Sequence, residues 1–191
     1  MVSGRDSVEK AAPSGLDALM RAAGSGTGPR PVETWNPPYC GGIGMKIRSD
    51  GTWMYQGSPI GRVALVKLFA SILRKDQDGR TYLVTPAEKI DCEVEDAPFL
   101  AVEMAVSGDG REQTLTFRTN VDDVVTVDAA HPMRFVVQQP DGGLKPYIGV
   151  RGRLEALVTR AVYADLVALA DNDSTGAPGI WSGGVWWPLT A

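Results

Sequence analysis

The sequence is poor in the residues from which the commonest catalytic and metal sites are built. Its 191 residues include one histidine, His131, and two cysteines, Cys40 and Cys92, which lie far apart in the chain. Histidine triads and multi-histidine metal sites therefore have little to draw on. A disulfide between the two cysteines is possible in principle, but they form neither a paired metal-binding motif nor a disulfide framework, and in the cytoplasm both thiols would stay reduced.

The sequence also lacks the loops that usually bind phosphate groups or carry a nucleophile. No glycine-rich loop ends in Gly-Lys-Ser or Gly-Lys-Thr, and no Gly-x-Gly-x-x-Gly joins a strand to a helix. Ser58 lies between two glycines, but Pro59 removes the backbone N–H that a nucleophile elbow lends to its oxyanion hole. A turn before a helix is the better interpretation of that segment.

Blocks of positive charge and long apolar runs are missing as well. The chain has 19 basic and 23 acidic side chains, with a net charge of −4. Nucleic acids and anionic membrane surfaces are bound through clustered cations, so we expect neither as a partner. No apolar stretch is long enough to span a bilayer, and residues 1–30 contain no continuous apolar segment typical of a signal peptide. We expect a cytoplasmic protein.

The residues that are present predict one compact body with a short N-terminal extension. Apolar residues make up 43% and charged residues 22% of the chain, as in ordinary globular proteins. Residues 1–31 predict a short, loosely attached helix, capped by Ser14, and a glycine-rich linker; the helix could dock on the body or bind a partner. We divide the body into a first half at 32–106 and a second half at 107–191.

Hydrophobic periodicity predicts an α+β fold with two repeated β-β-α-β-like motifs and additional antiparallel strands between them. The first motif has a hairpin turning at Asp50-Gly51, a helix from Arg62 to about Lys75, and a strand. The second motif has a hairpin turning at Gly152-Arg153, a helix from Arg160, and a final strand. The expected strands cover residues 45–48, 52–55, 81–85, 99–106, 114–119, 122–127, 133–137, 146–151, 154–157 and 185–189.

Three segments are expected to lie outside regular elements. Residues 33–42 contain two prolines, which argues against a helix or a central strand and favours an ordered strap. Residues 91–96 carry four carboxylates, and a solvated acidic loop is favoured over a Ca²⁺ or Mg²⁺ site because no glycine supplies the sharp turn. Residues 172–179 are expected to form a loop.

A few polar side chains are candidates for binding, each with a structural alternative. Arg118 and Asn120 end a clean strand, where an arginine suits a carboxylate or phosphate, although a structural salt bridge is the more common role. Arg62 and Arg160 begin helices whose dipoles oppose a cation, which hints at a fixed anionic partner. His131 either titrates near neutral pH or bonds the backbone. The tryptophans at 181, 186 and 187 either fill the core or form an interface.

Several segments together are similar to a known family. The sequences of 33–41, 50–62, 85–89, 95–99 and 117–120 resemble the bacterial domain-of-unknown-function family 1285. The resemblance implies an α+β fold of two repeated motifs and no established activity, with signalling or ligand binding only suggested. It brings no catalytic residues. The polar positions that match its pattern, and that we take as candidate ligand-binding residues, are Asn36, Arg62, Glu88, Arg118 and Asn120.

Three hypotheses follow. The first is a non-enzymatic sensing or signalling module without a cofactor, which binds a small anionic ligand or a protein partner in a cleft between the repeats. The second is a hydrolase or transferase that uses carboxylates such as Glu88 or Asp96, with or without a divalent metal. The third is an oligomeric interaction protein that associates through aromatic residues near Trp186.

Overall fold

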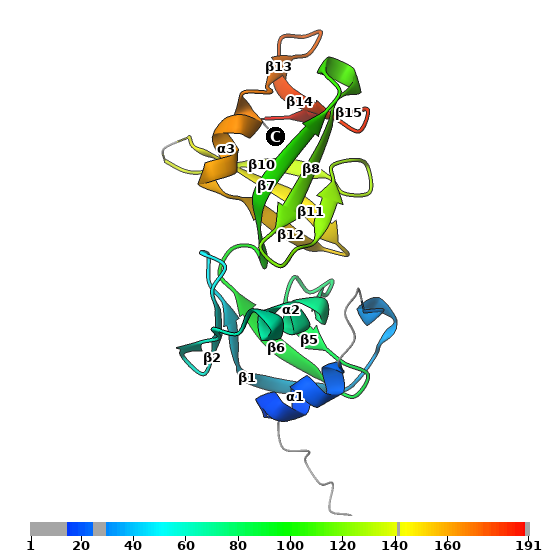
Figure 1. Ribbon diagram of the computed structural model, residues 1–191, viewed down its shortest axis with the longest axis vertical. Coiled ribbons are helices and arrows are strands. Elements are labelled where there is room, and N and C mark those ends of the chain that lie inside the picture. Colours follow the sequence, from blue (N-terminus) through cyan, green and yellow to red (C-terminus); the bar gives the residue numbers. More distant parts are fainter. Residues whose placement is uncertain (1–14, 25–29, 141, 190–191) are drawn as a thin grey trace, which may run out of the picture.

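The molecule consists of two lobes stacked end to end (Figure 1). The computed structural model describes residues 15–24, 30–140 and 142–189. One six-stranded sheet with the order β3-β2-β1-β6-β5-β4 forms the first lobe, and a second with the order β10-β11-β12-β7-β8-β9 forms most of the other. Within the described residues, no helix has the length and apolar character needed to cross a bilayer. Mixed helix and strand content confirms the coarse fold class.

The first lobe is built from its sheet, two helices and a 3₁₀ turn. The strands β1 and β6 pair in parallel, and the other neighbours in this sheet are antiparallel. The elements are α1 (Leu16–Ala23), the 3₁₀ turn η1 (Val32–Thr34), β1 (Tyr39–Ile47), β2 (Trp53–Tyr55), β3 (Ser58–Pro59), α2 (Val63–Ser71), β4 (Leu73–Lys75), β5 (Thr81–Val84) and β6 (Lys89–Val94).

Alternating side chains place the core of this lobe beneath α2. Ile47 and Trp53 are fully buried, and the Trp53 ring stacks on Phe69 of α2 at a centroid separation of 6.3 Å. The helix α1 packs on α2, with Leu19 and Ala23 buried. The N-terminal helix is therefore docked on the body, one of the two possibilities that the sequence left open for it. Ser14 and most of the glycine-rich linker lie outside the described residues.

Three expectations for this lobe are wrong. The segment 33–42 includes a 3₁₀ turn, and β1 begins at Tyr39, directly after Pro38, so the prolines precede this central strand and remove none of its hydrogen bonds. The acidic segment is mostly β6, also a central strand. The helix α2 stops at Ser71, and Leu73 is buried in β4 instead.

The second lobe carries a curved sheet, one helix and a small C-terminal sheet. The parallel pair here is β12 with β7. The C-terminal strands form a three-stranded sheet, β13-β14-β15. The loop expected over 172–179 is present at 173–177, between β13 and β14, and only its two ends lie in strands. The elements are β7 (Phe99–Ser107), the 3₁₀ turn η2 (Gly110–Glu112), β8 (Thr114–Thr119), β9 (Val124–Thr126), β10 (Met133–Val137), β11 (Leu144–Arg151), β12 (Leu154–Val158), α3 (Arg160–Val167), β13 (Asp171–Asn172), β14 (Pro178–Ser182) and β15 (Val185–Pro188).

Each lobe has a hairpin before its helix, but the strands around the helix differ between the lobes. In the first lobe, β1 and β2 precede α2, and the following strands join the same sheet. In the second, β11 and β12 precede α3, and the following strands form the separate C-terminal sheet. The division between the two large sheets lies between Val94 and Phe99, so β7, which we assigned to residues 32–106, pairs with strands of the second lobe.

The buried apolar residues of both lobes belong to one hydrophobic cluster, and a few separate polar contacts also join the lobes. The Arg151 guanidinium at the tip of the β11–β12 hairpin donates to the Ala70 carbonyl at the end of α2, at 2.6 Å. Lys67 of α2 forms an ion pair with Asp122, which follows β8. The β1–β2 turn approaches the second lobe at Gly51. These contacts leave a groove open between the lobes.

Candidate functional site

A groove of about 380 Å³ separates the β4–β5–β6 edge of the first lobe from the β11–β12 hairpin of the second. We call it the inter-lobe groove. Its volume lies within the range of small-molecule sites. The residues that line it are Lys75, Gly79, Arg80, Thr81, Asp91, Cys92, Glu93, Val94, Asp96, Ala97, Pro98, Arg153 and Glu155.

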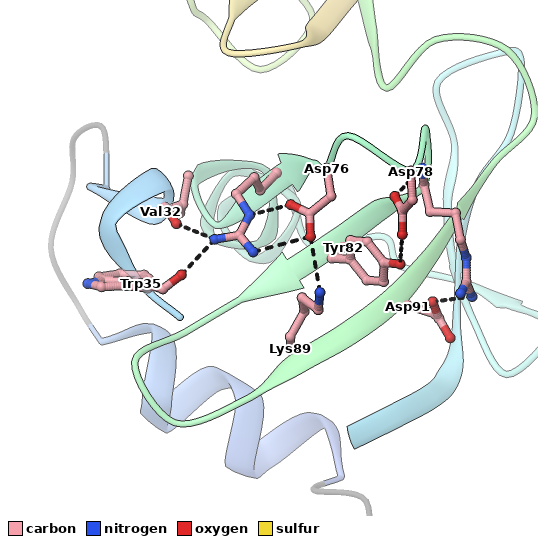
Figure 2. A network of polar contacts seen from close by, with 9 residues as sticks. Val32, Trp35, Asp76, Asp78, Tyr82, Lys89 and Asp91 are labelled. Atoms are coloured by element: carbon pink, nitrogen blue, oxygen red, sulfur yellow. Dashed lines mark hydrogen bonds and ion pairs between the residues drawn. The ribbon is translucent and has the colours of Figure 1, made fainter. Parts of the chain in front are cut away.

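The β4–β5 turn is held in place by a network of polar contacts (Figure 2). The Arg74 guanidinium donates to the Val32 and Trp35 carbonyls, both at 2.7 Å, and to the Asp76 carboxylate at 2.6 Å. Lys89 bonds the other oxygen of Asp76 at 3.0 Å. The network joins η1, β4 and β6, so the first-lobe wall of the groove is rigidly supported.

The same network continues across the face of Tyr82. The Tyr82 hydroxyl donates to Asp78 at 2.6 Å, which raises the pKa of Tyr82 to about 12. The ammonium of Lys89 and the guanidinium of Arg80 lie over its ring at 4.5 and 5.5 Å from the centroid. Arg80 in turn bonds Asp91 at 2.6 Å. These cations are therefore already engaged within the first lobe.

The four carboxylates of the groove wall each have a cation beside them. Asp91 accepts from Arg80 and from the Tyr39 hydroxyl. Glu93 lies 3.0 Å from Lys46, a lysine that it shares with Glu95. The other two are paired within the second lobe and its linker: Asp96 with Lys145, and Glu155 with Arg134, both at 2.6 Å. The negative charge of the wall is thus largely compensated.

Lys75 and Arg153 are the two groove cations without such a partner. Among the residues that the structure describes, neither side chain has a hydrogen-bond acceptor, a carboxylate or an aromatic face as partner. Lys75 is half-buried at the end of β4, whereas Arg153 is exposed at the β11–β12 turn. The groove therefore presents two uncompensated positive charges, one from each lobe.

A second groove, of about 470 Å³, lies on the other side of the β4–β5 turn and shares Arg153 with the first. Its lining is rich in carboxylates and amides. It includes Glu33, whose carboxylate oxygen packs so close to Gly152 that a Cβ added there would lie only 2.7 Å from it. The residues that line this second groove are Glu33, Trp35, Asn36, Arg74, Asp76, Gln77, Asp78 and Arg153.

Three features of the inter-lobe groove, a carboxyl group, a thiol and the potential metal ligands, do not favour acid, thiol or metal chemistry there. Burial alone would raise the pKa of Asp96, but hydrogen bonds from Lys145 and Tyr147 outweigh it and hold that pKa below its ordinary value. Burial raises the pKa of the Cys92 thiol to about 12, helped by Asp91 and Glu93, so the thiolate is scarce at neutral pH. Within the described residues, no three His, Cys, Asp or Glu side chains cluster as a metal site would require.

The five residues that the sequence singled out are not brought together. Asn36 lines the second groove. Glu88 is buried in the β5–β6 turn, where its N–H donates to the Thr85 hydroxyl. Arg62 is exposed immediately before α2, and no described residue pairs with its side chain. The other two have structural contacts in the second lobe.

Arg118 and Asn120 both bond neighbouring strands and turns. The Arg118 guanidinium binds Glu103 through two nitrogens and Asp122 through the third, at 2.5 to 2.8 Å. A structural salt bridge or a solvated strand end was the role favoured for Arg118 from its place in the sequence, and the salt bridge is present. Asn120 accepts a hydrogen bond from the Leu100 N–H at 3.0 Å. Neither residue lines the inter-lobe groove.

His131 closes a turn through its backbone N–H, and the three C-terminal tryptophans are half-buried. The His131 N–H donates to the carboxylate and the carbonyl of Asp128, which closes a turn. Trp181 and Trp186 pack against each other at a centroid separation of 5.2 Å, and the Arg111 guanidinium lies over the Trp181 ring. Trp187 packs on the hydrophobic core.

Lys75 and Arg153 were not predicted as site residues. The sequence assigned Lys75 to the end of a helix and Arg153 to a hairpin turn, both typical places for a solvated charge. The available signal was the Gly152-Arg153 turn, because turns between strands often carry binding residues. Only the stacking of the lobes brings this turn to face β4.

Comparison with known proteins agrees with this two-lobe description. Residues 30–97 match the model described as "Domain of unknown function (DUF1285), N-terminal domain". Residues 98–189 match "Protein of unknown function (DUF1285), C-terminal domain". The chain belongs to the DUF1285 family. No curated protein matches it.

Two solved structures of DUF1285 family proteins are similar to the chain. One, from Silicibacter pomeroyi DSS-3, shares 46% sequence identity and covers 92% of this chain and 94% of its own, with a TM-score of 0.86. Another, from Shewanella baltica OS155, shares 26% identity and covers 66% of this chain and 91% of its own, with a TM-score of 0.52. The fold and the family are thereby established.

Proposed function

We propose that this DUF1285 protein is a non-enzymatic sensing module that binds a small organic or inorganic anion in the inter-lobe groove. The observation that carries the proposal is the pair of uncompensated cations, Lys75 and Arg153, that face one groove from two lobes. A guanidinium is suited to carboxylate and phosphate oxygens by its planar arrangement of donors, and an ammonium adds a point charge.

The charge pattern of the wall favours an anion of limited size. The carboxylates that line the groove already have cationic partners, so Lys75 and Arg153 remain available to a ligand. A groove of about 380 Å³ suits a small metabolite rather than a macromolecule. The proposal retains the cytoplasm as the compartment and the two lobes as related halves of one signalling protein, both as expected from the sequence.

Calorimetric titration of the full chain tests the proposal. The probes are inorganic phosphate, pyrophosphate, succinate and citrate, and the variants are Lys75→Gln and Arg153→Gln. We expect at least one probe to bind the natural protein and each variant to bind it about tenfold more weakly, because hydrogen bonds to charged groups contribute about 1.5–3 kcal/mol.

Arg62→Gln is the matched control for this titration. Arg62 is also exposed and has no partner among the described residues, but it does not line the groove. Its loss should leave the affinity unchanged. Equal weakening by all three variants would indicate a non-specific effect of net charge, and binding of no probe at all would refute the proposal.

A further inference from the structure

We propose that the two lobes rotate about the Glu95–Asp96 linkage, and that an anion bound between Lys75 and Arg153 holds them in one orientation. This inference rests on the proposed function, because it assigns to the same groove the means by which binding becomes a signal. It concerns how the ligand acts, which the anion affinity alone does not decide.

The chain passes between the two large sheets once, and neighbouring residues of that passage are tied to different lobes. Glu95 belongs to the first lobe: its N–H donates to the Ile47 carbonyl at 3.0 Å, and its carboxylate accepts from Lys46 and from the Ser49 N–H, both at 2.9 Å. Its backbone and side chain are therefore both fixed to the β1–β2 hairpin.

Asp96 is tied to the second lobe instead. Its two carboxylate oxygens accept from the Lys145 ammonium and the Tyr147 hydroxyl, both on β11 and both at 2.6 Å. The consecutive residues Glu95 and Asp96 are thus fixed to different lobes. A change in the angle between the lobes would be taken up by the backbone torsions between Glu95 and Asp96, as in a hinge of few residues.

The remaining contacts between the lobes permit such a rotation. Within the described chain, no helix or strand of one lobe lies along a helix or strand of the other. The polar contacts are isolated: the Lys67–Asp122 ion pair is exposed, and Arg151 reaches Ala70 through a single bond to its carbonyl. The buried apolar residues of the two lobes belong to one hydrophobic cluster, so the lobes would slide over this contact as they rotate. Small sliding movements of packed surfaces are one form of domain motion.

The ligand groove spans this hinge. Lys75 moves with the first lobe and Arg153 with the second, while Asp96 of the hinge lies in the groove wall. An anion that contacts both Lys75 and Arg153 binds most tightly in the lobe orientation that brings the two side chains close enough to reach it together. A ligand shifts a conformational equilibrium through its difference in affinity for the two states, so binding would favour the closed orientation.

Pulsed electron resonance on the full chain measures the predicted motion. Spin labels are placed at Ala64→Cys on α2 and Ala164→Cys on α3, both exposed positions on helices, in a Cys40→Ser background. Cys92 is 3% exposed and remains unlabelled. The distance distribution is recorded with and without phosphate, pyrophosphate, succinate and citrate, and calorimetry is run on the same labelled protein.

The expected result is a shifted and narrower distance distribution with any probe that gives binding heat. The shift should disappear in Arg153→Gln at a probe concentration that still saturates it, because Lys75 alone joins nothing across the groove. Binding heat with an unchanged distribution would overturn the hinge and leave the proposed function standing.

Two other outcomes are also decisive. A full shift in saturated Arg153→Gln would overturn the bridging role of that residue. Absence of binding heat with every probe would overturn the proposed function and, with it, this inference.

Discussion

Arg74 shows how much of the first lobe depends on one side chain. Its guanidinium is buried and joins the segment around Val32 and Trp35 to Asp76 at the end of β4 (Figure 2). In the sequence this arginine follows an apolar run with helical spacing, so it looks like the solvent side of a helix end. It is a buried residue because the chain leaves the helix at Ser71 and enters a strand.

Replacing Arg74 by methionine should lower the free energy of unfolding by about 3–5 kcal/mol. The substitution leaves two carbonyls without their donor and removes one of the two cations of Asp76, and breaking a buried ion pair from one side is costly. Arg48→Met is the control, because Arg48 is exposed and should change stability by less than about 0.5 kcal/mol. Urea unfolding of both variants checks this, and similar losses would contradict it.

Asp76 should make the free energy of unfolding depend on pH in the acidic range. Burial would raise its pKa, but hydrogen bonds from Arg74 and Lys89 outweigh burial and hold the pKa below the ordinary value of 3.8. The unfolded chain then binds more protons than the folded one, so this contribution is complete above pH 3.8 and is lost as pH falls through the lower folded pKa.

Urea unfolding between pH 6 and pH 2.5, for the natural protein and Asp76→Asn, measures this contribution. The difference in unfolding free energy between the two proteins should be constant above pH 5 or so and should shrink in acid, because the variant has lost the group that titrates. A difference that stays constant over the whole range would show that Asp76 is not responsible.

At the scale of single elements, the β1–β2 turn requires a glycine at position 51 because of its backbone conformation and because the second lobe lies close to it. Gly51 has a φ of +82°, and a Cβ there would lie 2.9 Å from Leu100 Cδ1 and 3.0 Å from Asn120 Nδ2 of the other lobe. The Asp50-Gly51 pair predicted the turn correctly from the sequence. The contact with the second lobe could not be predicted, since it depends on how the lobes stack.

Gly51→Ala and Gly57→Ala form a matched pair of turn variants. Gly57 has a φ of +81° and open space around it, so alanine there should cost only the left-handed backbone, about 1–2 kcal/mol. Alanine at Gly51 should cost about 0.5–1.5 kcal/mol more, because the ends of the Leu100 and Asn120 side chains have to shift away from it. Thermal and urea unfolding measure both. Equal costs would mean that the lobes separate without penalty at this point.

Elements with strict alternation were predicted more reliably than elements with ambiguous patterns. The strands β8 and β10 have the bounds expected from their alternating residues. The strand β6 was missed because Asp91 and Glu93 made it look like an acidic loop, although Ile90 and Cys92 alternate with them and are buried. A strand can carry carboxylates on one face when cations lie beside them, as Arg80 lies beside Asp91.

For the whole molecule, the stability of the lobe contact should rest mainly on Arg151. Its half-buried guanidinium donates to the Ala70 carbonyl and to Asp123, and lies 4.9 Å from the centroid of the Phe99 ring. We expect Arg151→Met to lower the free energy of unfolding by about 2 kcal/mol, as for hydrogen bonds made by charged groups.

Lys67→Met provides the comparison for Arg151. The Lys67–Asp122 ion pair also joins the lobes, but it is exposed, and exposed pairs contribute about 1 kcal/mol or less. Urea unfolding of both variants separates the two contributions. A larger loss for Lys67→Met than for Arg151→Met would show that the assignment is reversed.

The sequence by itself determined the elements with clear alternation or helical spacing, the mixed fold and the family resemblance, because alternation, helical spacing and turn residues act over a few neighbouring positions. It also showed that histidine, thiol and phosphate-loop chemistry has few residues to draw on. Only the tertiary structure decided that Arg118 is neutralised by Glu103 and Asp122, and that Lys75 and Arg153 face one groove. Charge compensation depends on residues that are distant in the chain and meet only when the lobes are stacked.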